Sequence, residues 1–134
     1  MRGAVLAAIA VAVAVAVTGC GHARPRYVFP PAEIPAIGTV VEGIASWYGP
    51  GYNHNRTSSG EVYDQDGLTA AHYNWAFGTR VRVTFLSTGR STVVRVNDRF
   101  PNHKGRVIDL SRGAARAIGL IGPGTGPVRL EIIG

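Results

Sequence analysis

Hydrophobic and polar residues alternate with a period of two over much of the second half of the chain. Val81, Val83 and Phe85 are separated by polar residues, and Val94 and Val96 repeat this spacing after a Thr-Gly-Arg turn. Such alternation is typical of strands with one buried face, so the two segments predict a β-hairpin. Three further strands are expected at 43–48, 106–110 and 128–132.

One helix is expected among these strands. Ser111 is placed to cap it, the helix continues through Ala117, and Gly119 ends it. Short strands, a single helix and 18 glycines in 134 residues disfavour a helical bundle. The pattern therefore predicts a mainly β protein. We expect a small closed barrel rather than a sandwich, because closure leaves no unpaired strand edge.

The first twenty residues have a different character. After Arg2, residues 4–17 form an uncharged stretch of fourteen residues built almost wholly of Ala and Val. It is shorter than the roughly twenty residues that cross a bilayer, so it predicts a signal peptide over 1–19. The stretch ends in Val-Thr-Gly-Cys, which places Cys20 where bacterial lipoproteins are lipidated. The alternative is ordinary cleavage near Gly19, which would leave Cys20 as a free thiol.

A proline-rich segment follows this cysteine. Residues 20–38 contain four of the eight prolines, and we interpret them as the lipidated cysteine and a stiff tether. The folded domain is then expected at 39–134. The whole pattern predicts an exported protein that is anchored to a membrane through lipid on Cys20. The anchor would lie in the outer membrane if the host is Gram-negative, and otherwise on the outer face of the cell membrane.

Composition and charge narrow the classes of partner. The chain has 14 basic and 8 acidic residues and a net charge of +6, which suits an anionic polymer or membrane surface. A nucleic-acid partner is disfavoured, because the chain is expected to be exported and its arginines are dispersed. A single cysteine excludes an internal disulfide and a cysteine-based zinc site. His54, His72 and His103 fit no usual zinc spacing, so no metal is expected.

Three polar clusters separate the predicted strands, at 56–63, 68–72 and 96–101. They contribute Glu61, His72 and Asp98, respectively. Two carboxylates and one histidine on separate loops are the minimum set for cleavage of a glycoside. Each residue also has a structural interpretation: Asp98 as a turn residue bonded to its own backbone, Glu61 as a solvated charge, and His72 as a satisfied core residue.

Seven short blocks of the sequence together resemble the rare lipoprotein A family. They lie, in order, at 43–49, 57–61, 68–72, 77–81, 94–99, 105–111 and 122–125. The resemblance implies a six-stranded double-psi β-barrel with one or two short helices. It also implies septal lytic transglycosylase activity on peptidoglycan, with a preference for glycan strands without stem peptides. The products would carry 1,6-anhydromuramic acid ends, and neither a metal nor an organic cofactor would be needed.

The same resemblance implies a role for each candidate catalytic residue. Asp98 is expected to act as general acid and then as base, Glu61 to assist it, and His72 to hydrogen-bond within the site. Phe100 departs from the family pattern, which usually has Gly at this position. Its ring would either narrow the groove or stack on a sugar.

Aromatic and polar side chains near these blocks are expected to bind the glycan. The candidates are Trp47, Tyr48, Tyr63, Asn97, Arg99 and Phe100. Trp47 and Tyr48 are neighbours on a predicted strand, so they are expected to point to opposite faces. Arg99 and Arg106 are candidates for the lactyl carboxylate of muramic acid, and Asp109 is expected to fix the start of the helix.

A non-catalytic protein remains the main alternative. Expansin-like proteins use the same barrel without net hydrolysis, so the chain would then bind or loosen peptidoglycan. The sequence ends at Gly134 without the peptidoglycan-binding domain that many relatives append. We therefore expect a monomer that reaches its site through its lipid, its own groove or a partner whose identity the sequence does not indicate.

Overall fold

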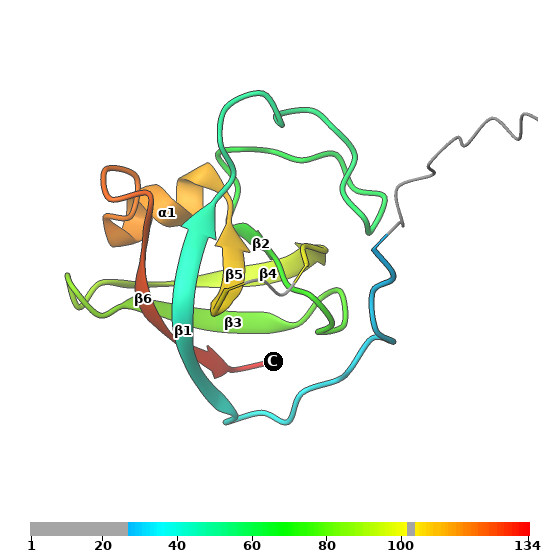
Figure 1. Ribbon diagram of the computed structural model, residues 1–134, viewed down its shortest axis with the longest axis horizontal. Coiled ribbons are helices and arrows are strands. Elements are labelled where there is room, and N and C mark those ends of the chain that lie inside the picture. Colours follow the sequence, from blue (N-terminus) through cyan, green and yellow to red (C-terminus); the bar gives the residue numbers. More distant parts are fainter. Residues whose placement is uncertain (1–26, 102–103) are drawn as a thin grey trace, which may run out of the picture.

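The computed structural model describes residues 27–101 and 104–134, and within them the chain forms six strands and one helix (Figure 1). The elements are β1 Val40–Trp47, β2 Thr69–Ala71, β3 Arg80–Phe85, β4 Ser91–Asp98, β5 Arg106–Leu110, α1 Arg112–Ile118 and β6 Thr125–Ile132. The predicted signal peptide, Cys20 and His103 lie outside the described residues.

The six strands close into a barrel in the order β1-β5-β2-β4-β3-β6. Two neighbouring pairs, β1 with β5 and β2 with β4, are parallel, whereas the other four pairs are antiparallel. The predicted fold class is therefore confirmed: a small, mainly β, closed six-stranded barrel with one short helix. Closure pairs both edges of every strand, which matters for a chain with so small a core.

The alternation of apolar and polar residues in the sequence determines which side chains form the core. On β3, Val81, Val83 and Phe85 are buried while the residues between them are more exposed. Val81 pairs with Val94 of β4, and Val83 pairs with Leu130 of β6, so the same apolar face continues around the barrel. The predicted β3–β4 hairpin is thus confirmed.

Strand boundaries differ from the prediction in three places. Residues 69–71 were expected in a polar loop but form β2, which has only three residues and is too short to show a period. The strand expected at 43–48 begins earlier and ends at Trp47, and the last strand begins at Thr125 rather than at 128.

Helix α1 is fixed at both ends as predicted. The Ser111 hydroxyl accepts a hydrogen bond from the backbone N–H of Ala114 at 3.2 Å. Gly119 ends the helix with φ 83°, a left-handed conformation that glycine adopts without strain. The helix reaches Ile118, one residue further than expected. Across residues 27–101 and 104–134, no helix has the length and apolar character needed to cross a bilayer.

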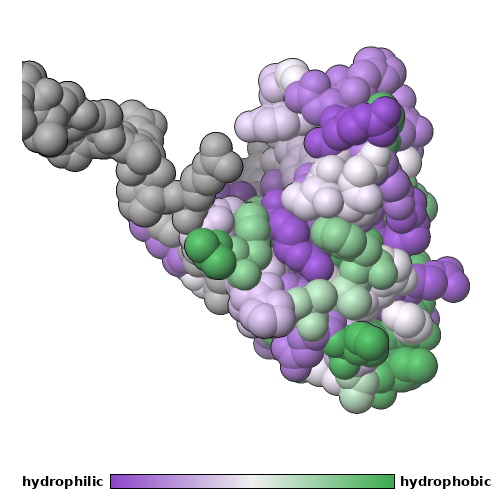
Figure 2. Space-filling model, turned by 90° about the vertical axis from the view of Figure 1, so that its right-hand side faces the viewer, coloured by the Kyte–Doolittle hydropathy of each residue, from purple (hydrophilic) through white to green (hydrophobic). Residues whose placement is uncertain are grey.

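The proline-rich segment contacts the barrel before β1 begins. The backbone N–H of Glu33 donates to the Asn74 carbonyl at 2.7 Å, and the Ala76 N–H donates to the Glu33 carbonyl at 2.8 Å. The described part of this segment runs along one side of the barrel (Figure 1). On the face that includes it, hydrophobic residues form separate clusters among polar ones (Figure 2). Five of the exposed large apolar side chains come from this segment: Tyr27, Val28, Phe29, Ile34 and Ile37.

Candidate active site

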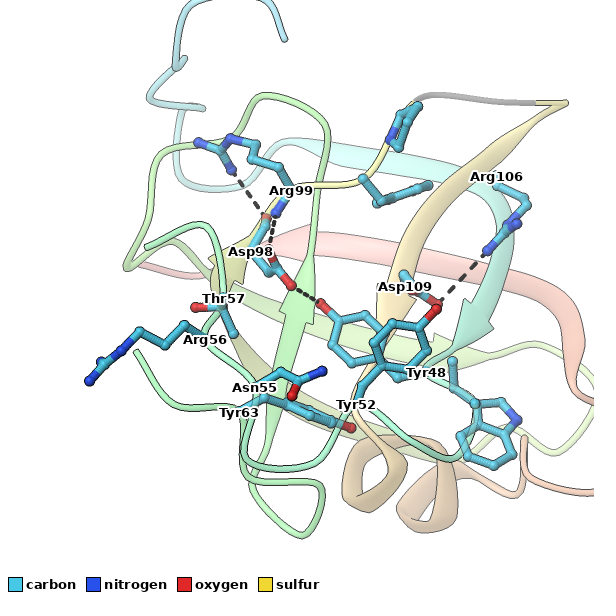
Figure 3. A pocket seen from close by; sticks show the side chains of 14 residues that line it. Tyr48, Tyr52, Asn55, Arg56, Thr57, Tyr63, Asp98, Arg99, Arg106 and Asp109 are labelled. Atoms are coloured by element: carbon cyan, nitrogen blue, oxygen red, sulfur yellow. Dashed lines mark hydrogen bonds and ion pairs between the residues drawn. The ribbon is translucent and has the colours of Figure 1, made fainter. Parts of the chain in front are cut away.

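The segment between β1 and β2 arches beyond the end of β1 (Figure 1). Several of its residues line a cavity of about 400 Å³ (Figure 3). Its wall combines aromatic rings, three arginines and two aspartates. The lining residues are Trp47, Tyr48, Gly49, Tyr52, Asn55, Arg56, Thr57, Tyr63, Asp98, Arg99, Phe100, Pro101, Arg106 and Asp109. Asp98 is therefore in the cavity wall, whereas Glu61 and His72 are not among its lining residues.

Four hydrogen bonds fix the Asp98 carboxylate. Its Oδ2 atom accepts from the Tyr48 hydroxyl at 2.8 Å (Figure 3). Its Oδ1 atom accepts from the Ser58 backbone N–H at 2.9 Å, from the Ser58 hydroxyl at 2.7 Å and from the Arg99 N–H at 2.8 Å. The donors come from three separate segments of the chain. Asp98 is thus more than a turn residue bonded to its own backbone.

The position of Asp98 depends on an irregularity in the barrel. In β2 and β4, Thr69 pairs with Arg95 and Ala70 with Val96, but the register then shifts so that Ala71 pairs with Asp98. A β-bulge of this kind adds one residue to one strand and redirects the side chains that follow. Asp98 is therefore brought beside Ala71 at the end of β4.

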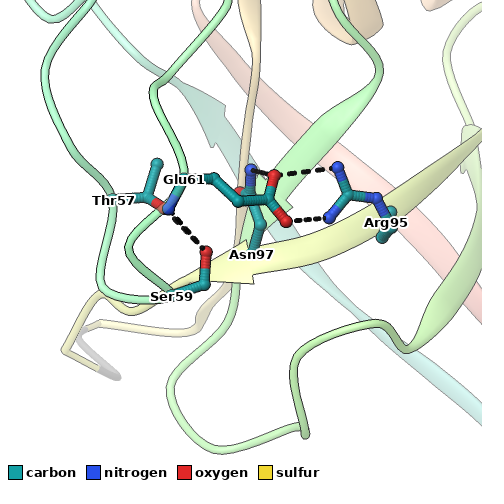
Figure 4. Close-up of polar contacts among 5 residues, drawn as sticks. All are labelled: Thr57, Ser59, Glu61, Arg95 and Asn97. Carbon is teal, nitrogen blue, oxygen red and sulfur yellow. Dashed lines mark hydrogen bonds and ion pairs between the residues drawn. The ribbon is translucent and has the colours of Figure 1, made fainter.

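Glu61 lies outside the cavity and holds a turn in place (Figure 4). Its carboxylate accepts two hydrogen bonds from the Arg95 guanidinium, at 2.5 and 2.9 Å, and one from the Asn97 side chain at 3.2 Å. The Arg95 hydrogen bonds, followed by that of Asn97, lower the pKa of Glu61 below its ordinary value. Since the Thr57 N–H donates to the Glu61 carbonyl, this ion pair joins the turn that carries Ser58 to strand β4.

His72 is a buried residue whose ring organises the backbone after β2. Its Nδ1 atom accepts hydrogen bonds from the N–H groups of Asn74 at 3.2 Å and Trp75 at 2.9 Å, so this nitrogen carries no proton. The ring stacks on Trp75 with centroids 3.8 Å apart. Burial, reinforced by the charge of Arg99, lowers the pKa of His72 to about 3. The His72 N–H also donates to the Asp98 carbonyl at 3.1 Å, which supports the end of β4.

Asp109 is the second carboxylate in the cavity wall. It lies on β5 between the buried residues Ile108 and Leu110, so its side chain is on the face opposite to the core. The Ser46 hydroxyl donates to its Oδ1 atom at 2.8 Å. The Asp109 side chain is only 15% exposed, and Arg106 lies 3.9 Å away (Figure 3).

Burial of the Asp109 carboxyl raises its pKa to about 6. The Ser46 hydrogen bond and the Arg106 charge act in the opposite direction, and the charge of Asp98 raises the pKa further. Asp109 is therefore a carboxyl group that can hold a proton near pH 6 while it faces the cavity.

Tyr48 connects Asp98 to the aromatic wall. Burial, followed by the charge of Asp98 and the hydrogen bond to it, raises the pKa of the Tyr48 phenol, which keeps it a donor. Its ring packs edge-to-face on Tyr63 with centroids 4.7 Å apart. Trp47 and Tyr48 were expected on opposite faces, but both line the cavity. The strand ends at Trp47, so the alternation does not extend to Tyr48.

The remaining predicted binding residues are placed as follows. Tyr63, Arg99 and Phe100 line the cavity, as does Arg106. The Arg99 guanidinium lies over the Phe77 ring, 4.1 Å from its centroid. Asn97 is buried and holds Glu61 but is not part of the wall.

A second hollow, of about 310 Å³, adjoins the first. The two share four wall residues: Trp47, Tyr48, Gly49 and Tyr63. The second hollow adds Pro50, Gln65, Arg112 and Ile121. Together they form an extended surface with aromatic side chains at its centre.

Two contributors to this site were not assigned by the sequence. Ser58 lies in a Thr-Ser-Ser-Gly-Glu run, and the sequence does not distinguish its role from that of Ser59. Only the folded turn shows that the Ser58 hydroxyl hydrogen-bonds to Asp98. Asp109 was expected to fix the helix start, but Ser111 does so. In the part of the chain that the structure describes, no group of three or more His, Cys, Asp or Glu side chains could hold a metal ion.

Comparison with known proteins identifies close relatives of this barrel. A family model described as lytic transglycolase matches residues 40–130. The chain is 54% identical over 99 residues to the endolytic peptidoglycan transglycosylase RlpA of Campylobacter jejuni, covering 74% of this chain and 36% of that protein. It is 60% identical over 97 residues to the probable endolytic peptidoglycan transglycosylase RlpA of Synechocystis, covering 72% of this chain and 30% of that protein. The chain thus spans about a third of the length of these relatives.

Solved structures share the barrel at lower sequence identity. The Streptomyces papain inhibitor matches 76% of this chain and 100% of its own, with a TM-score of 0.62 and 22% identity. An expansin of Clavibacter michiganensis matches 72% of this chain and 51% of its own, with a TM-score of 0.58 and 25% identity. The papain inhibitor, at this identity, supports the fold alone.

The raised pKa of Asp109 predicts a pH-dependent effect on stability. In the unfolded chain this carboxyl ionises near pH 4, whereas in the folded protein it ionises near pH 6, so the folded protein loses stability as pH rises from about 4 through about 6. An Asp109→Asn variant should therefore gain stability over the wild type as pH rises from 4 to 7.5. The relative gain should approach about 3 kcal/mol, since each pKa unit corresponds to about 1.4 kcal/mol.

Thermal and urea unfolding at pH 4, 5, 6 and 7.5 would measure this difference. Glu131→Gln is a suitable control, because Glu131 forms an exposed ion pair with Arg82 on the barrel surface. A stability difference between Asp109→Asn and wild type that did not change with pH would contradict the prediction.

Proposed function

The chain belongs to the rare lipoprotein A family of lytic transglycosylase domains, and we propose that it cleaves peptidoglycan glycan strands. The bond broken would be that between N-acetylmuramic acid and N-acetylglucosamine, and the product would carry a 1,6-anhydromuramic acid end. The matched relatives are named for this activity, but this chain covers about a third of their length. The proposal for this protein therefore rests on its own site as well.

One observation carries the proposal: a pair of carboxyl groups lies in an extended hollow lined by aromatic rings and arginines. Cleavage of a glycosidic bond needs a proton for the leaving oxygen and a group that activates the attacking one. Asp98 and Asp109 supply two carboxyl groups within one cavity wall. Aromatic faces at the centre of the hollow suit sugar rings, whose C–H groups pack on them.

Asp98 is the proposed catalytic carboxylate for the attacking hydroxyl. In a lytic transglycosylase the 6-hydroxyl of the muramic acid itself attacks the anomeric carbon, so no water is consumed. The Asp98 carboxylate is the acceptor in all of its side-chain hydrogen bonds, which come from Tyr48, Ser58 and Arg99. This environment suits a carboxylate that accepts a proton from the sugar.

The arginines support a preference for strands without stem peptides. Arg56, Arg99 and Arg106 line the first hollow, and Arg112 lines the second. Removal of the stem peptide leaves a free lactyl carboxylate on each muramic acid, and a guanidinium pairs well with a carboxylate. A strand that still carries peptides lacks this anion. The extent of the two hollows also suits a polymer better than a single small sugar.

Glu61 and His72 act in this proposal as positioning residues. Glu61 holds the turn that brings Ser58 to Asp98, and His72 holds the backbone beside the end of β4. Phe100, which replaces the usual Gly, lines the cavity beside Arg106, whose guanidinium lies 5.8 Å from the ring centroid. We propose that this ring forms part of a sugar-stacking wall.

Lipid anchoring at Cys20 is proposed from the sequence. The apolar segment and the small residues before Cys20 support it, and the acyl chains would hold the protein at the cell envelope. The twelve residues between Cys20 and Glu33 could extend up to about 40 Å, at about 3.4 Å per residue. The barrel could then act on wall polymer at a distance from the membrane. A role in wall remodelling and daughter-cell separation follows from the same proposal.

Product analysis tests the proposed reaction. The full chain, incubated with peptide-free glycan strands, should release fragments with 1,6-anhydro ends, detected by mass spectrometry. Asp98→Asn should reduce this release at least about 100-fold, in line with the contribution of proton transfer to such reactions. Fragments with reducing ends, heavier by the mass of one water, would identify a hydrolase instead. Binding to intact sacculi without any product would support the expansin-like alternative.

If Glu61 acts as a positioning residue, its ion-pair partner Arg95 should contribute as much to activity as the Glu61 carboxylate itself. Arg95→Ala should lower product release by about fivefold, and Glu61→Ala by a similar factor, because exposed ion pairs contribute up to about 1 kcal/mol. The double variant should be little worse than either single one. Arg82→Ala removes a comparable exposed pair with Glu131 and should have no effect. If Arg95→Ala retained full activity while Glu61→Ala lost it, Glu61 would act on the substrate directly.

Lipidation is tested by fractionation of cells. The wild type should sediment with membranes and carry a mass increase at Cys20, whereas Cys20→Ser should be found in the soluble fraction. Wild-type protein in the membrane fraction with an unmodified Cys20 would contradict the anchor.

A further inference from the structure

Asp109 and Asp98 lie on either side of one residue of β2. Ala71 pairs with Asp109 of β5 on one side and with Asp98 of β4 on the other. Neighbouring strands are about 4.8 Å apart, so the two aspartates are separated by roughly 10 Å at their Cα atoms. Both side chains reach the same cavity (Figure 3). The bulge at Ala70 and Ala71 creates this arrangement, because an unbroken register would place Asn97 opposite Ala71.

The two carboxyl groups have different surroundings. Asp98 accepts hydrogen bonds on both oxygens, from Tyr48, Ser58 and Arg99. On Asp109 the Ser46 hydrogen bond reaches Oδ1, and no described residue hydrogen-bonds to Oδ2. Asp109 thus keeps one oxygen available within the cavity wall, whereas Asp98 has none without a partner.

Some charged and titratable groups around Asp109 raise the pKa of its carboxyl, and others lower it. Arg106 on the same strand favours its ionised form, and the charge of Asp98 opposes it. The phenols of Tyr48 and Tyr63 are the other titratable groups near this carboxyl. Burial outweighs these influences and raises the pKa of Asp109 to about 6. A proton donor near neutral pH requires such an environment.

We propose that Asp109 is a second catalytic residue and donates the proton to the leaving glycosidic oxygen, while Asp98 accepts the proton of the attacking hydroxyl. This inference rests on the proposed transglycosylase function. It divides between two residues the proton transfers that the family resemblance implied for Asp98.

The step is balanced in atoms and electrons. The bond between the anomeric carbon and the glycosidic oxygen breaks, and that oxygen takes the proton of Asp109. The 6-hydroxyl oxygen forms a bond to the anomeric carbon and releases its proton to Asp98. Solvent then returns a proton to Asp109 and removes one from Asp98. The 1,6-anhydro bridge and the broken β-linkage lie on the same face of the sugar ring, which matches two carboxyl groups on one side of the substrate.

Two substrates distinguish a general-acid role of Asp109 from a merely structural one. Natural glycan strands have a basic leaving oxygen that needs a proton, whereas the 4-nitrophenyl glycoside of N-acetylmuramic acid has a leaving group that needs none. Asp109→Asn should reduce cleavage of glycan strands at least about 100-fold but release of nitrophenol by less than about tenfold. Asp98→Asn should reduce both. Equal losses on the two substrates, or full activity of Asp109→Asn on strands, would overturn the inference.

The pH profile gives an independent readout. Activity of the wild type on glycan strands should fall above about pH 6, as Asp109 loses its proton. Ser46→Ala removes a hydrogen bond that lowers the pKa of Asp109, so the fall should move to higher pH. A fall that stayed at the same pH in Ser46→Ala would count against Asp109.

Two controls separate the possible failures. Thermal unfolding at pH 7 should show that Asp109→Asn is folded, and Glu131→Gln should match the wild type on both substrates. Wild-type protein that released no anhydro products would overturn the proposed function itself. Anhydro products from the wild type and equally from Asp109→Asn would leave that function intact and overturn only the role of Asp109.

Discussion

The site depends on one irregularity in the pairing of β2 with β4. Between Ala70 and Ala71 the register shifts by one residue, and this shift brings Asp98 to the cavity. A regular parallel register would instead place Asn97 beside Ala71, and Asp98 would not share the register position of Asp109. The bulge survives because β2 is bonded on both sides, to β4 and to β5, and because the closed barrel allows neither neighbour to move away.

Contacts from distant parts of the chain then hold the carboxylate that the bulge presents. Tyr48 follows β1 and is fifty residues from Asp98 in sequence. Ser58 belongs to a turn forty residues from Asp98, and Arg99 is its neighbour. The turn is held in its own right by the ion pair of Glu61 with Arg95 on β4. The proposed catalytic geometry is thus maintained by residues outside the cavity as well as by those that line it.

The sequence predicted most of the fold, because the alternation on β3, β4, β5 and β6 directly reflects which side chains enter the core. It missed β2, since three residues cannot show a period, and it could not reveal the bulge, which is a property of strand pairing. Asp98 was singled out as a candidate by its polar cluster and by the family resemblance. Ser58 and Asp109 were not, because their roles depend on a loop folding back over the outer face of the barrel.

Asp109 illustrates how the site and the stability of the barrel oppose one another. A carboxylate is better solvated in water than at a position that is 15% exposed. Ionisation of Asp109 therefore costs the folded state free energy as pH rises from about 4 through about 6. The Ser46 hydroxyl and Arg106 offset only part of this cost. An apolar or amide side chain at this position would serve the barrel better, as the unbroken apolar face of Ile108 and Leu110 does on the other side of the strand. A strained or costly group in a cavity is what function, rather than folding, requires. The same burial that disfavours the charge keeps a proton on Asp109 where a leaving oxygen would need it.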